Sequence, residues 1–157
     1  NNITWKGLYM IDLESILTEW QQDCEISQHQ LDEVSRQTPS LHAKYLQHLA
    51  FAKLQFKRSE NKQKILLKRK FLYYNGKMSQ EDLLESGWDL DPLNGLRMLK
   101  GELEYYYDAD PEIQKSEERL MYYKTLIETL TNIVDTLKWR HQTISNMIKW
   151  RQFEAGG

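Results

Sequence analysis

The sequence predicts an all-α protein built on two long helices, a basic central helix and a C-terminal heptad helix. Turn signals are too rare for a multi-stranded sheet, because the 157 residues include only seven glycines and three prolines. Apolar residues instead recur at helical spacing over two long stretches, Pro39 to Tyr74 and Pro111 to Phe153. A content of 40% hydrophobic and 28% charged residues is typical of one soluble globular domain.

The N-terminal part of the chain is expected to contain two short helices. Residues 1–9 show no helical period and are interpreted as an N-terminal extension before Met10. Asp12 can cap a helix over residues 13–25, in which apolar residues recur at steps of three and four. A second helix is predicted over residues 28–37 and should end before Thr38 and Pro39. Threonine is a good cap, and proline fits the first position of a new helix.

The central helix is predicted to run from Pro39 to Tyr74 and to end at the Asn75-Gly76 turn. Glu60 and Gln63 interrupt its apolar face, which suggests a bend or loop near Ser59. The residues assigned to that face are Tyr45, Leu49, Ala52, Phe56, Leu67, Phe71 and Tyr74. Residues 77–111 read as irregular, with short helices expected at 79–85 and near 93–107.

The C-terminal segment carries the cleanest pattern, an a/d heptad that runs through the last predicted helix. The candidate oligomerisation residues on it are Leu120, Tyr123, Ile127, Leu130, Val134, Leu137, Ile144 and Ile148. A helix of about 40 residues is about 60 Å long, which is more than one small domain covers. We therefore divide the chain into a helical binding region, residues 10–110, and an oligomerisation helix, residues 111–157. The alternative is that this helix packs back on the central one.

Positive charge is concentrated between Lys53 and Lys77, where nine Lys or Arg residues meet one acid, Glu60, in a chain of net charge −2. Cations alternate there with aromatic residues, and single-stranded nucleic acid requires both, for its phosphates and for its unpaired bases. The candidate DNA-binding residues are Lys57, Arg58, Lys62, Lys64, Lys68, Arg69, Lys70, Tyr73, Tyr74 and Lys77. The following segment, Met78 to Glu112, holds ten acids against two cations and could dock a basic partner or remain solvated.

Other chemistry finds little support in the sequence. The single cysteine, Cys24, excludes an internal disulfide framework and a cysteine-based zinc site. No glycine-rich phosphate loop and no histidine pair with metal-ligand spacing occurs, so we predict no enzyme activity, no metal and no cofactor. No apolar run is long enough to span a bilayer. Two alternatives remain open: a coiled-coil adaptor whose basic patch meets an acidic partner or a membrane surface, and a metal-dependent nuclease that uses the acidic segment.

The segment from Leu67 to Lys77 resembles the single-strand-binding motif of the UvsY family of T-even bacteriophages. That motif is a Leu-Lys-x-Arg-Leu-x-Tyr-Tyr run followed by a small residue, a glycine and a cation. The ending Phe153-Glu154-Ala155-Gly156 is similar to the family's C-terminus, and Met10 to Leu17 lies where the family's start would fall. The resemblance places the family's two key cations at Lys68 and Lys70, although Lys70 stands where the motif has arginine.

The resemblance implies a recombination mediator without enzyme activity. It implies a homo-oligomeric ring, a hexamer or heptamer, assembled through the C-terminal helix. Such a ring binds single-stranded DNA and helps to load a UvsX-type recombinase onto strands covered by the phage single-strand-binding protein. The implied location is the cytoplasm of the infected bacterial host.

Overall fold

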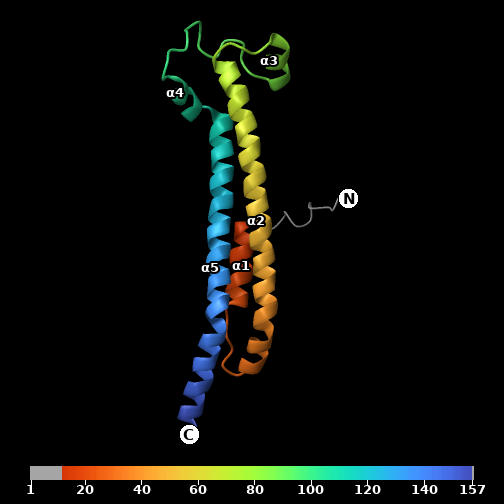
Figure 1. Ribbon diagram of the computed structural model, residues 1–157, viewed down its shortest axis with the longest axis vertical. Coiled ribbons are helices and arrows are strands. Elements are labelled where there is room, and N and C mark those ends of the chain that lie inside the picture. The colour runs from red at the N-terminus through yellow and green to blue at the C-terminus, as the bar shows by residue number, and fades with distance from the viewer. Residues whose placement is uncertain (1–11, 157) are drawn as a thin grey trace, which may run out of the picture. The chain divides into compact units, whose positions relative to one another are not determined.

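The computed structural model describes residues 12–156, which form five helices and no strand (Figure 1). They are α1 (Leu13–Asp23), α2 (Leu31–Tyr74), α3 (Gln80–Ser86), α4 (Leu103–Asp108) and α5 (Pro111–Glu154). The predicted all-α class is confirmed, whereas the predicted extension over residues 1–9 lies outside the described residues. Two compact units can be distinguished: unit 1 comprises residues 12–55 and 123–156, and unit 2 comprises residues 56–122.

Unit 1 is a three-helix arrangement of α1, the first part of α2 and the later part of α5 (Figure 1). Asp12 caps α1 as predicted, because its Oδ1 accepts a hydrogen bond from the Ser15 N–H at 2.7 Å. The apolar faces of the three helices meet in one core. Its buried members are Ile16, Tyr45, Leu49, Ala52, Leu126, Leu130, Ile133 and Leu137.

The predicted break before Pro39 is wrong, since α2 begins at Leu31 and contains Pro39. The Thr38 hydroxyl does not cap a new helix but donates to the Val34 carbonyl at 2.9 Å. Proline inside a helix removes one backbone hydrogen bond. Burial opposes that cost, because Leu31 and Val34 pack with Ile144 of α5 in a second apolar cluster. The loop suggested near Ser59 is also absent, because α2 remains helical through that position.

Helix α5 has the predicted limits to within one residue, but its central buried face is shifted from the predicted heptad. The buried positions beyond residue 120 are Leu126, Leu130, Ile133, Leu137, Arg140 and Ile144. Leu130, Leu137 and Ile144 therefore lie in the chain's own core, and this corrects the expectation that they face other subunits. Leu120, Tyr123, Ile127 and Val134 are half-buried, and Ile148 is exposed. The assignment of residues 111–157 to oligomerisation stays a prediction.

Unit 2 contains the second part of α2, the two short helices and the start of α5. Helix α3 lies at the predicted place, with Ser79 as its N-cap and Gly87 as a left-handed C-cap. The predicted helix near 93–107 is wrong in its first half, because only residues 103–108 are helical. Asn94, Gly95 and Gly101 adopt positive φ values, which a helix does not allow. Gly76 ends α2 as predicted, with φ at +67°.

Candidate nucleic-acid interface

Seven of the ten candidate DNA-binding residues lie exposed on or just beyond the second part of α2. They are Lys57, Arg58, Lys62, Lys64, Lys68, Arg69 and Lys77. Helical periodicity explains why these side chains are exposed. Steps of three and four residues that continue the buried positions Tyr45, Leu49 and Ala52 do not reach any of the six cations on the helix. Lys57 pairs with Glu60 at 3.4 Å, but the lysine side chain is 62% exposed, and such pairs contribute little. Unit 2 thus presents a solvated row of cations.

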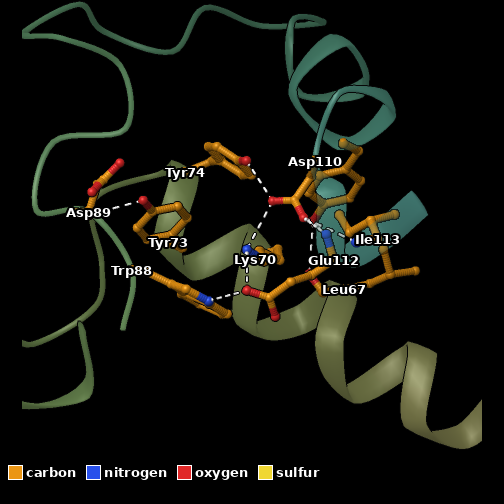
Figure 2. Close-up of polar contacts among 10 residues, drawn as sticks. Leu67, Lys70, Tyr73, Tyr74, Trp88, Asp89, Asp110, Glu112 and Ile113 are labelled. Carbon is orange, nitrogen blue, oxygen red and sulfur yellow. Dashed lines mark hydrogen bonds and ion pairs between the residues drawn. The ribbon is translucent and has the colours of Figure 1, made fainter. Parts of the chain in front are cut away.

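Lys70 differs from this group, because its side chain is only 5% exposed. Its Nζ lies 2.9 Å from Asp110 Oδ2 and 3.5 Å from Glu112 Oε1 (Figure 2). The same ammonium group lies 3.9 Å from the centroid of the Trp88 ring. A buried cation requires such partners, since desolvation of an unpaired charge is very costly. In this structure Lys70 is a buried anchor and presents no charge to a DNA phosphate.

Asp110 is the centre of this anchor and caps α5. Its Oδ1 accepts from the backbone N–H groups of Glu112 at 2.9 Å and Ile113 at 3.1 Å. Its Oδ2 accepts from the Tyr74 hydroxyl at 2.7 Å (Figure 2). Burial raises the pKa of Asp110, but hydrogen bonds from Tyr74, Lys70 and Ile113 outweigh it, so the pKa is lowered overall. The carboxylate therefore stays ionised in a site that is 2% exposed.

Tyr73 and Tyr74 are held by internal contacts instead of standing free on the surface. The Tyr73 side chain is buried and donates to the Asp89 carbonyl at 3.0 Å (Figure 2). Its ring packs at 4.9 Å from Trp88 and 5.0 Å from Tyr74, measured between centroids. Burial raises the pKa of both hydroxyls, and for Tyr74 the hydrogen bond to Asp110 adds to the rise. Both tyrosines are therefore neutral hydrogen-bond donors at ordinary pH.

Arg69 is exposed but is held in one direction. Its guanidinium lies 4.9 Å from the Trp88 ring centroid and donates to the Ser86 hydroxyl. Trp88 in turn donates from Nε1 to Glu112 Oε1 at 2.6 Å. Trp88, Asp110 and Glu112 were not predicted from the sequence as part of the site. An available signal was the Asp110-Pro111 pair, because aspartate followed by proline is typical of a helix start.

Exposed aromatic side chains lie on the last part of α5. Trp139, Trp150 and Phe153 are each more than 60% exposed, and the rings of Trp150 and Phe153 stack with centroids 5.6 Å apart.

In the part of the chain that the structure describes, no helix is long and apolar enough to cross a membrane. Over the same residues, no group of three or more His, Cys, Asp or Glu side chains is placed to hold a metal ion.

Comparison with known proteins decides the family. A family model described as "Recombination, repair and ssDNA binding protein UvsY" matches residues 19–157. The chain belongs to the UvsY family. It is 26% identical to the recombination protein UvsY of Enterobacteria phage T4 over 144 residues, which cover 92% of this chain and 98% of that protein. The family assignment that the Leu67–Lys77 motif suggested is thereby confirmed, and the protein is a UvsY-type recombination mediator.

Crystal structures of the bacteriophage T4 mediator UvsY share this fold. The lattice type II structure matches with a TM-score of 0.77 at 25% identity, covering 92% of this chain and 98% of that one. The lattice type IV structure matches with a TM-score of 0.75 at 24% identity, covering 92% and 99%. The UvsY fold therefore extends over nearly the whole of both chains.

Proposed function

We propose that this UvsY-family protein binds single-stranded DNA along the exposed cations of α2 and helps to load a UvsX-type recombinase onto strands covered by single-strand-binding protein. The observation that supports the proposal is the row of exposed Lys and Arg side chains on residues 57–69, continued by Lys77. Each phosphate that such a side chain neutralises releases a counterion, and this favours binding whatever the base sequence. The family description, which names single-stranded DNA binding, agrees with it.

The contacts to phosphate are assigned to Lys57, Arg58, Lys62, Lys64, Lys68, Arg69 and Lys77. Lys70 has a different part in the proposal, because two carboxylates already satisfy its charge. It fixes the end of α2 to the start of α5, and Arg69, the preceding residue, is oriented by Trp88 of the same cluster. Lys70 is therefore a positioning residue for the binding surface.

Several copies of the surface would act together in a ring-shaped hexamer or heptamer. Modest affinity for each copy then becomes tight binding of one strand, because later contacts are intramolecular. Ile148, Trp139, Trp150 and Phe153 on α5 are the exposed apolar residues that we assign to contact between subunits. The protein would hydrolyse nothing and use no cofactor. It would act in the cytoplasm of the infected host by presenting the strand to the recombinase.

The test is a matched pair of double variants in full-length protein. Lys64→Ala with Lys68→Ala removes two exposed cations of α2, and Lys115→Ala with Lys124→Ala removes two exposed cations of α5. Binding of fluorescent oligo-dT is followed by anisotropy over a range of salt concentrations. The α2 variant should bind more weakly. The negative slope of log K against log salt should also become less steep, by about 0.7 for each phosphate that is no longer neutralised. The α5 variant should bind like the parent.

Equal binding by the α2 variant and the parent would show that this surface is not the DNA site. Loading is tested separately, by recombinase filament formation on strands coated with single-strand-binding protein. Addition of the parent should shorten the lag, whereas the α2 variant should not. Naked strands serve as the control, because no coating protein has to be displaced there. A parent that leaves the lag on coated strands unchanged would refute the mediator mechanism while leaving DNA binding intact.

A further inference from the structure

Unit 2 contains a pocket of about 440 Å³ beside the end of α2. Tyr73 and Tyr74 of α2 line it, together with Leu83 of α3 and Leu93 of the following loop. Tyr73, Leu83 and Leu93 are each less than 10% exposed, so they belong to the buried part of the wall. Small-molecule sites in proteins have volumes of about 300–1,000 Å³. The pocket is therefore large enough for a planar ring system of the size of a purine.

The lining also carries both kinds of polar group that a nucleobase needs. The Asp91 carboxylate can accept a hydrogen bond, and the Arg97 guanidinium can donate one. Every nucleobase carries at least one N–H donor and one acceptor on its Watson–Crick edge, so such a pair does not select one base. Tyr73 and Tyr74 add aromatic side chains to the lining, and contact between a base and an aromatic ring is equally tolerant of base identity. This combination suits a protein that binds single strands of any sequence.

The position of the pocket argues for DNA as its occupant. Tyr73 and Tyr74 lie about one helical turn beyond Lys68 and Arg69, and Lys77 follows the lining residue Gly76. A strand bound along these cations would thus reach the pocket with its bases unpaired. We propose that this pocket receives one unpaired nucleobase of the bound strand, with Asp91 and Arg97 meeting its polar edge. The inference rests on the proposed function and names a base-binding site within it.

The experiment compares two oligonucleotides of equal length and charge, oligo-dT and an abasic strand that keeps the sugars and phosphates. The parent should bind the abasic strand at least about fivefold more weakly, as expected when base stacking is removed. Two variants then alter the pocket. Leu90→Ala with Leu96→Ala removes two lining side chains that are 66% and 72% exposed, and Met98→Trp fills the space. In both variants, the ratio of the affinity for oligo-dT to the affinity for the abasic strand should fall toward one.

Leu84→Ala is the matched control, since Leu84 is 76% exposed in the same unit but does not line the pocket. It should keep the full preference. If the parent bound both strands with equal affinity and in a salt-dependent way, the base pocket would be refuted and the proposed DNA binding would stand. Binding of neither strand would refute the proposed function itself. If the exposed double alanine variant kept the full preference, the base site would lie elsewhere, whether or not Met98→Trp folds.

Discussion

Replacing Asp110 by alanine should destabilise unit 2 by about 3–5 kcal/mol, the range for removing one partner of a buried ion pair. The substitution leaves Lys70, 5% exposed, with Glu112 at 3.5 Å as its remaining carboxylate. It also removes the N-cap of α5, which alone contributes about 1 kcal/mol. Finally it deprives the Tyr74 hydroxyl of its acceptor at 2.7 Å. One carboxylate supplies all three interactions, so their separate costs do not simply add.

Two further variants separate charge from capping. Asp110→Asn keeps an oxygen for the cap or for Tyr74 but removes the charge, so its cost should be smaller than that of alanine. Lys70→Met combined with Asp110→Asn should recover part of the stability, because no uncompensated charge is then buried. Asp108→Ala is the control, since that side chain is exposed and should change stability by less than about 0.5 kcal/mol.

Urea unfolding gives the free energies, and hydrogen exchange assigns them to unit 2. Exchange should accelerate at the end of α2, residues 66–74, and at the start of α5, residues 111–118, while residues 126–137 in unit 1 remain protected. A destabilisation below about 1 kcal/mol for Asp110→Ala, with protection unchanged, would refute the reasoning. It would mean that Lys70 reaches water when its partner is removed, and that the ion pair does not hold the two helices.

Two further outcomes are expected in unit 1. Leu130→Ala should lower the free energy of unfolding by about 2–5 kcal/mol, because Leu130 is 1% exposed in the core. Ile148→Ala, at 37% exposure, should lower it by less than about 1 kcal/mol. Equal losses for the two variants in urea unfolding would contradict the assigned core. Burial lowers the pKa of His48 more than nearby Glu19 raises it. The unfolded state then binds more protons, so stability should fall as pH drops below about 6.5. His48→Gln should flatten that fall, and an unchanged pH profile would exclude His48 as its source.

The sequence sufficed for the fold class and for most helix limits, because these depend on local signals. Asp12 and Ser79 are N-caps, and Gly76 is a left-handed C-cap, each within one element of the chain. The start of α2 could not be predicted in this way. Thr38 and Pro39 carry a strong local signal for a helix start, but packing of Leu31 and Val34 on α5 outweighs it. Local propensity failed where a distant contact decided the outcome.

The candidate site was predicted less well, because apolar residues alone were used to trace the buried faces. Steps of three and four from Tyr45 through Ala52 lead to Ser59 and Lys70, both of which are buried. The apolar pattern led instead to Phe71, which is 41% exposed. On α5 the same steps from Leu126 lead to Arg140, which the predicted heptad did not include. In both helices a cation occupies a core position, which a search for apolar residues alone does not find.

Each of these two buried cations has its partners at the end of another helix. Lys70 meets the carboxylate that caps the start of α5, and Arg140 donates to the carbonyls of Asp23 and Glu25 at the end of α1, at 2.6 and 3.1 Å. A helix end offers unpaired backbone groups and the residues that cap them, so it can compensate a buried charge that an apolar core cannot. Lys70 is therefore coupled to Asp110 although forty residues separate them in the chain. A substitution at either position should alter DNA binding through the placement of Arg69, Tyr73 and Tyr74, and should lower stability at the same time. Removal of an exposed cation such as Lys68 should alter binding alone, and this difference separates the two kinds of residue within one motif.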